Sequence, residues 1–184
     1  MGKVAFFVYD QFAMWQVALL QKFLVNKGYT IETVSIGGGL ISSDGGMLIS
    51  STSMEGKDPN QYDIFLMAGG EITEELLQNV ALLAFIKGFE GVIAASCASS
   101  VLVAAAGKLQ GKYTTLPHIN EHFRHYYQEG TYIDTECCVD GNIITSRGHA
   151  HYDFMIAVLE KIGLSGNDPR LQKIALKLSK NGHE

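Results

Sequence analysis

The sequence has few cysteines, and their arrangement excludes two kinds of protein. Only three occur among 184 residues, and two of them, Cys137 and Cys138, are adjacent. An odd count without paired spacing gives no disulfide framework, and no set of metal ligands is evident. We therefore expect a protein of a reducing, cytoplasmic environment that needs no metal ion and no cofactor.

Blocks of basic charge and long apolar runs are also missing. The chain carries 14 Lys and Arg against 19 Asp and Glu, a net charge of -5. This balance argues against nucleic acid or an anionic membrane surface as a partner. No apolar run approaches the roughly 20 residues that cross a bilayer. The apolar run at residues 4–9 is broken too early by Asp10 for a signal peptide. A small molecule of unknown identity is the expected ligand.

Apolar residues are plentiful, at 47% of the chain, which suffices for one domain with a full core. Strand and helix patterns alternate, which predicts an α/β fold with a mostly parallel sheet. The domain is expected at residues 1–165, followed by a helical tail at 166–184. We expect strands at residues 4–9, 29–36, 63–67 and 92–96, hairpins at 40–51 and 132–146, and helices at 10–27 (capped by Asp10), 71–88 (in one or two pieces), 101–106, 120–128, 152–162 and 170–180.

The segment around Cys97 predicts a nucleophile elbow. A buried strand, 92–96, turns directly into a helix, and the residues that flank the cysteine are small. A crowded, strained bend between strand and helix tolerates only small neighbours. The start of the helix should favour the thiolate, so we expect the pKa of Cys97 to lie below that of a free thiol. The alternative is a buried, inert core cysteine.

Four segments in this order resemble the ThiJ/PfpI family, which is related to class I glutamine amidotransferases. They are residues 7–12, 63–70, 95–109 and 142–148. The resemblance implies a three-layer sandwich with a mostly parallel central sheet, of the flavodoxin-like and glutamine amidotransferase-like type, with a nucleophile elbow. It also implies that Cys97 supplies a thiolate and that the backbone N–H groups of Gly70 and Ala98 form an oxyanion site.

Two positions depart from the family pattern. The first helix of family members usually carries an acidic residue that hydrogen-bonds the cysteine sulfur, and here the matching residue is Gln16. A glutamine hydrogen-bonds sulfur but does not exchange a proton as a carboxylate does. The positions where many members have a histidine hold Ala98 and Leu116.

Two histidines are candidate substitutes for the missing base. His118 follows Pro117, two positions from the expected site, and it is equally well explained as a structural residue. His149 lies in a loop that, in dimeric relatives, approaches the cysteine pocket of the partner, and its alternative role is to pack the start of the last helix. The resemblance also implies a homodimer. Apolar residues of the first helix, among them Phe12, Trp15 and Leu19, exceed one buried stripe. For Trp15 itself the core is the expected place, with the wall of the cysteine pocket as the alternative.

Two functions follow from these residues, and a degenerate scaffold without chemistry is the third alternative. The first is an enzyme, a hydrolase, glyoxalase or deglycase that acts through Cys97 on a small carbonyl or amide. The second is a non-enzymatic stress-response protein in which oxidation of Cys97 is the signal. The missing carboxylate and histidine favour the second function, and the elbow fits both.

Overall fold

The computed structural model describes residues 2–164, together with 169, 173 and 177. An eight-stranded sheet lies at its centre, with strand order β3-β4-β2-β1-β5-β6-β10-β9. The pairs that join β4, β2, β1, β5, β6 and β10 are parallel, and only the hairpins at the two edges are antiparallel. The strands are β1 Lys3–Phe7, β2 Thr30–Ser35, β3 Gly39–Ser42, β4 Leu48–Ser53, β5 Ile64–Met67, β6 Val92–Ser96, β9 Cys137–Asp140 and β10 Ile143–Ser146.

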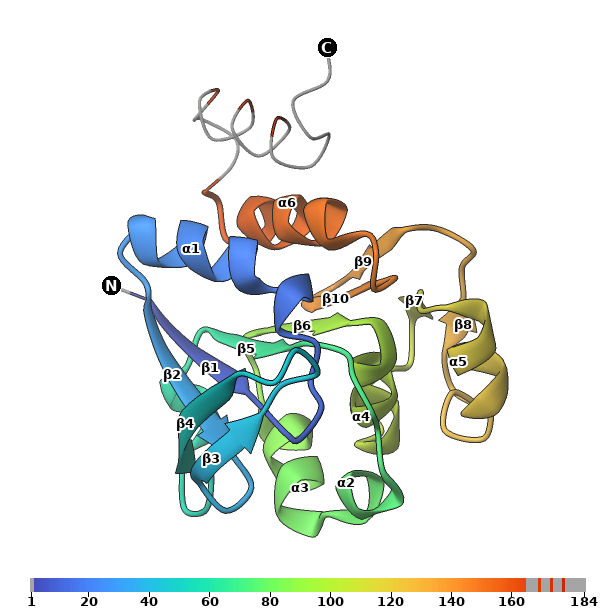
Figure 1. Cartoon of the computed structure of the whole chain (residues 1–184). Helices are drawn as coiled ribbons and strands as arrows, with labels where there is room; N and C mark the ends of the chain where they lie inside the picture. The colour runs from blue at the N-terminus through green and yellow to red at the C-terminus, as the bar shows by residue number, and fades with distance from the viewer. Residues whose placement is uncertain (1, 165–168, 170–172, 174–176, 178–184) are drawn as a thin grey trace.

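Helices cover both faces of the sheet, which confirms the predicted three-layer sandwich. In Figure 1, α1 and α6 lie above the sheet, and α2, α3 and α4 lie below it. A small parallel pair, β7 and β8, stands to one side with α5. The remaining elements are α1 Ala18–Asn26, α2 Glu74–Gln78, α3 Val80–Gly88, α4 Ser100–Ala105, β7 Lys112–Tyr113, α5 Pro117–His122, β8 Thr131–Tyr132 and α6 His151–Lys161.

The central strands form the core because both of their faces are covered. Every residue of β5 and β6 is buried, and so are the last four residues of β1. Continuous apolar runs of this kind are typical of parallel strands between helical layers. The three strands end at the same edge of the sheet, where ligands of parallel α/β folds bind. Cys97 follows β6 and the Gly69-Gly70 pair follows β5, so both lie at this edge.

The first helix begins later than predicted, and Asp10 does not cap it. A 3₁₀ turn at Met14–Gln16 precedes α1, and the Asp10 carboxylate instead accepts from the Ser42 N–H at 3.1 Å. The reason is tertiary, because Phe12 bridges to residues of two other segments, Ser43 and Gly70. These bridges hold the segment before α1 out of the helical conformation. Gln16 therefore lies on the 3₁₀ turn and not within a long helix.

Other boundaries differ by smaller amounts. The helix expected at 71–88 consists of two pieces, because Asn79 ends α2 and caps α3 through its side chain. The helix expected at 120–128 begins at Pro117, a residue favoured in the first turn, and ends at His122. Within the described residues, no helix is long and apolar enough to span a bilayer. The tail at 166–184 and its helix at 170–180 fall almost entirely outside the described residues.

Candidate active site at Cys97

The Cys97 backbone has the strained conformation of a nucleophile elbow. Its φ is 57°, in the left-handed region that residues with a side chain rarely adopt, and a 3₁₀ turn leads from it into α4. The surroundings are tight, since a Cβ on Gly69 would lie 2.6 Å from the Cys97 Cβ. The side chain is buried, with 8% of the residue exposed. This geometry agrees with the elbow that the sequence predicts.

Three N–H groups surround the Cys97 sulfur. They come from the Ala98 backbone, the Gln16 side-chain amide and the Gly148 backbone. Burial raises the pKa of the Cys97 thiol, and the three hydrogen bonds lower it by less than burial raises it. The expected lowering of the pKa is therefore wrong in direction. The start of the helix was expected to lower the pKa, but desolvation of the buried sulfur raises it and is the larger effect.

The orientation of the Gln16 amide is fixed by a second contact. Its Oε1 accepts a hydrogen bond from the Gly69 N–H at 2.8 Å, in a buried position. With the oxygen engaged there, the amide nitrogen is the group left to face Cys97, which agrees with its effect on the pKa. Gln16 therefore acts on the sulfur as a donor at every pH. A carboxylate in its place donates only when it is protonated.

Gly148 is a contact of the sulfur that the sequence argument did not single out. A Cβ on this residue would lie 2.8 Å from the Gln16 amide nitrogen and 3.1 Å from the Cys97 sulfur. Only glycine leaves room for this approach of backbone to sulfur. Its neighbours on either side are held by Glu136, whose carboxylate pairs with Arg147 at 3.2 Å and with His149 at 2.6 Å. Glu136 therefore fixes the loop that carries Gly148.

Gly70 has the conformation and the free donor that an oxyanion site requires. Its φ is 146°, and a Cβ there would lie 2.4 Å from the Gln11 carbonyl oxygen. Among the described residues, no hydrogen-bond acceptor takes the Gly70 N–H. The neighbouring Gly69 contacts Cys97 directly. The Gly70 N–H is thus available to a ligand beside the cysteine.

The two candidate bases lie away from the sulfur of their own chain. His118 is exposed in the first turn of α5, and the His149 imidazole is turned toward Glu136 with 62% of its side chain exposed. Of the groups on described residues that hydrogen-bond the Cys97 sulfur, none is an imidazole or a carboxylate. The chain therefore brings together Cys97, Ala98, Gln16 and the glycine pair, and leaves both histidines outside.

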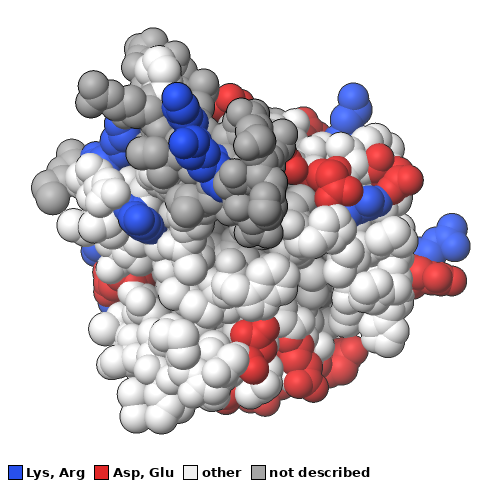
Figure 2. Space-filling view, turned by 45° about the horizontal axis from the view of Figure 1, so that its top comes forward, with Lys and Arg blue, Asp and Glu red and all other residues white. Residues whose placement is uncertain are grey.

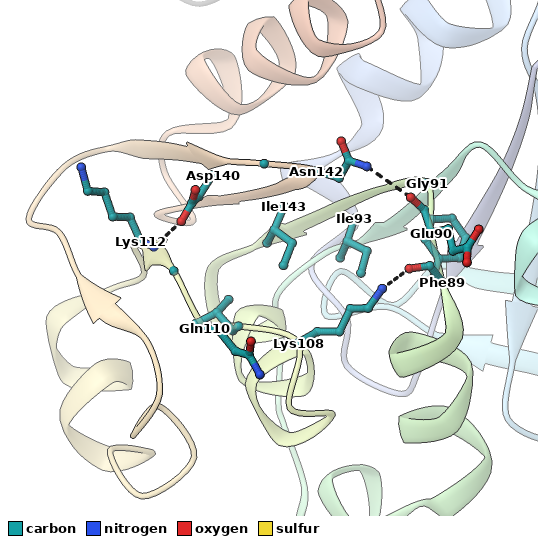
Figure 3. Close-up of a pocket in the computed structure, with 13 residues that line it drawn as sticks. Phe89, Glu90, Gly91, Ile93, Lys108, Gln110, Lys112, Asp140, Asn142 and Ile143 are labelled. Atoms are coloured by element: carbon teal, nitrogen blue, oxygen red, sulfur yellow. Dashed lines mark hydrogen bonds between the residues drawn. The ribbon is translucent and has the colours of Figure 1, made fainter.

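A hollow of about 350 Å³ lies at the opposite end of the strands (Figure 3). Ile93 and Ile143 form its apolar side, and the Lys108 ammonium donates to the Phe89 carbonyl across it. It borders the amino ends of β6 and β10, whereas Cys97 follows the carboxyl end of β6. Its lining contains no cysteine, serine or histidine, and the Lys108 amine is engaged by the Phe89 carbonyl. Within the described part of the chain, no cluster of three or more His, Cys, Asp or Glu could hold a metal ion.

Comparison with known proteins places this fold and elbow in a family. The model of the DJ-1/PfpI family matches residues 2–161, nearly the whole described chain. The chain belongs to the DJ-1/PfpI family. Among curated proteins, the uncharacterised protease YdeA of Bacillus subtilis is 27% identical over 168 residues, which is 88% of this chain and 84% of that protein. DJ-1alpha of Drosophila melanogaster is 32% identical over 126 residues, 63% of this chain and 56% of that protein.

Solved structures of DJ-1 proteins share the fold. The DJ-1 superfamily protein Atu0886 of Agrobacterium tumefaciens superimposes with a TM-score of 0.83 over the full length of both chains, at 23% identity. DJ-1beta of Drosophila melanogaster gives a TM-score of 0.81 at 19% identity, over 96% of this chain and 97% of that one. At these identities the structures establish the DJ-1/PfpI architecture and leave the chemistry to be argued from the site.

Proposed function

We propose that this DJ-1/PfpI protein is a redox-responsive thiol protein in which peroxide oxidises Cys97 to a sulfinate. The observation that carries the proposal is the set of three N–H donors around the sulfur, with no base among the described residues that hydrogen-bond it. Sulfinic acids are anions at neutral pH, and their oxygens accept hydrogen bonds more strongly than sulfur does. Gln16 supports this form especially well, because it donates whatever the pH.

The oxidation takes two balanced steps. The Cys97 thiolate attacks one oxygen of hydrogen peroxide, the O–O bond breaks, and the sulfenic acid and hydroxide form. The sulfenate then attacks a second peroxide, which gives the sulfinate and water. Because burial raises the pKa of Cys97, the thiolate fraction at neutral pH is small. The reaction therefore needs a raised peroxide concentration, which fits a response to oxidative stress.

Graded peroxide treatment followed by peptide mass mapping tests the proposal. Cys97 should gain two oxygen atoms and stop there, because the three N–H donors stabilise the sulfinate. Cys97→Ser should show no such modification, and Cys138→Ser serves as the matched control that keeps it. Oxidation of Cys138 as readily as Cys97, or direct passage of Cys97 to the sulfonate, would contradict the proposal.

A second candidate function is an enzyme of the hydrolase, glyoxalase or deglycase type. The free Gly70 N–H beside Cys97 favours it, because such a donor stabilises the oxyanion formed when a thiolate attacks a carbonyl. One relative is named a protease, although an uncharacterised one. The reaction needs a base, and the candidates are His118, or His149 reaching the cysteine of a second copy.

A panel of small glyoxals, amides and esters tests the enzyme. Turnover should disappear in Cys97→Ser, and either His118→Ala or His149→Ala should lose about 10²- to 10⁴-fold, the usual contribution of a general base. If no substrate is turned over in a reaction that depends on Cys97, the enzyme is contradicted and the redox function is the proposal that remains.

We also propose that the protein forms a homodimer through the β3–β4 hairpin and the turn before α1. Trp15, which was expected in the core, is 52% exposed, and its indole donates to Asp44 of the hairpin turn at 3.0 Å. The hairpin that carries Asp44 also has three exposed apolar side chains, Leu40, Met47 and Leu48. Figure 2 shows an area without charged side chains at the lower left, the side where β3 and β4 lie in Figure 1. Exposed apolar surface of this kind marks an interface.

Light scattering tests the dimer. The wild type should give twice the chain mass at micromolar concentration, and Leu48→Lys should give the monomer mass. Val80→Lys is the matched control, because Val80 is also an exposed apolar residue but lies at the start of α3 and not on the hairpin. A monomeric wild type would also remove the role of His149 in a second copy.

A further inference from the structure

Three hydroxyl groups lie beneath the Cys97 elbow, and the site described above does not use them. The Ser100 and Thr115 hydroxyls both donate to the Cys97 carbonyl oxygen, at 2.8 and 3.0 Å. The Tyr127 hydroxyl lies 2.7 Å from the Ser100 oxygen. All three residues are buried, and Tyr127 comes from the segment after α5, 30 residues beyond the cysteine in the chain.

The direction of these hydrogen bonds follows from the number of protons. A serine hydroxyl has one proton, and that of Ser100 is engaged by the Cys97 oxygen. Ser100 must therefore accept from Tyr127, which keeps its proton because burial raises the pKa of its phenol well above the usual value. The Tyr127 ring is fixed in turn by parallel stacking on Tyr113, with 4.5 Å between ring centroids.

The hydrogen-bond chain ends on the peptide group that contacts the sulfur. The Cys97 carbonyl and the Ala98 N–H belong to one peptide unit, and that N–H is a donor to the Cys97 sulfur. Hydrogen bonds to the carbonyl oxygen polarise the peptide and strengthen its N–H as a donor. They also hold the plane of the peptide at a residue whose backbone is strained.

We propose that Tyr127 is a positioning residue for Cys97, acting through Ser100 and the Cys97–Ala98 peptide to strengthen the N–H that stabilises the thiolate. The inference rests on the proposed function in one respect, namely that the thiolate is the reacting form. It assigns to the segment after α5 a control over the reactivity of Cys97 that operates through hydrogen bonds alone, without contact between Tyr127 and the reagent.

The experiment measures iodoacetamide alkylation of Cys97 against pH, by peptide mapping, for wild type, Tyr127→Phe and Ser100→Ala. Below the pKa of Cys97, Tyr127→Phe should react about 1.3-fold to fourfold more slowly, since each cooperative bond adds about 10–30% to a charged hydrogen bond. The apparent pKa should move upward, and Ser100→Ala should show a larger change in the same direction. Tyr113→Phe is the matched control, because its hydroxyl bonds Asn120 at 2.6 Å and not Ser100. Its profile should match the wild type.

The sign of the change separates positioning from simple loosening of the structure. A variant that only opens the buried site reduces desolvation, so Cys97 would react faster and its pKa would fall. Three results would overturn the proposal: this faster reaction, an unchanged profile in both variants, or an equal change in Tyr113→Phe. If Tyr127→Phe does not fold, the profile of Ser100→Ala decides. Peroxide treatment of the same proteins is read separately. A wild type that is alkylated as expected but not oxidised would overturn the redox function and leave the positioning role standing.

Discussion

Replacement of Gln16 by methionine tests the electrostatics of the site most directly. The two side chains have similar length, but methionine donates no hydrogen bond to the sulfur. It also does not replace Oε1 as the acceptor of the Gly69 N–H, a bond of 2.8 Å in the wild type. A hydrogen bond to a charged group contributes about 1.5–3 kcal/mol. Its loss raises the pKa of Cys97 and lowers the thiolate population by about tenfold to a hundredfold below that pKa. The thiolate is the species that reacts, so alkylation should slow by the same factor.

The assay is the rate of iodoacetamide labelling of Cys97 between pH 6 and 10, with thermal unfolding measured in parallel. Gln16→Met also leaves the buried Gly69 N–H without a partner, which costs about 1–3 kcal/mol and should lower the melting temperature by several degrees. Gln128→Met is the control, because Gln128 is exposed. A labelling profile that superimposes on the wild type would refute the argument that the Gln16 amide nitrogen faces the sulfur.

Three further predictions concern the same framework. Gly148→Ala should displace the loop from the sulfur and slow alkylation of Cys97, whereas Gly37→Ala, where a Cβ meets nothing within 4 Å, should behave as wild type in the same labelling assay. Burial raises the pKa of Cys137 to about 12, so Cys137 should label far more slowly than Cys97 at pH 8. Comparable labelling of the two cysteines would contradict the burial of Cys137. Hydrogen bonds from two lysines lower the pKa of Glu32 to about 2. The stability that the ionised carboxylate contributes to the folded protein is therefore complete above the ordinary pKa of about 4.5 and is lost as pH falls toward 2. Glu32→Gln should therefore destabilise the protein by about 1 kcal/mol at pH 7, with the difference closing below pH 4.5, as urea unfolding at several pH values would show.

The layer order is implied by the family resemblance, whereas the sequence by itself determines the strands of the core and the position of Cys97. These features rest on local patterns, namely continuous apolar runs, glycine punctuation and small residues around one cysteine. The start of α1 shows where local pattern fails. The apolar residues from Asp10 onward read as one helix, but the bridges of Phe12 to Ser43 and Gly70 hold that segment in a turn. Such contacts join residues more than 30 positions apart, and no local signal announces them.

Only the tertiary structure decides the chemistry of the sulfur. Its donors come from positions 16, 98 and 148, and the hydroxyls beneath it from positions 100, 115 and 127. The sequence singles out Gln16 as a departure, but the Gly69 N–H decides which end of its amide faces Cys97. It places a thiol at a helix start and so predicts a lowered pKa, whereas the depth of burial raises it. Desolvation depends on everything packed around a group, and that sum exists only once the chain has folded.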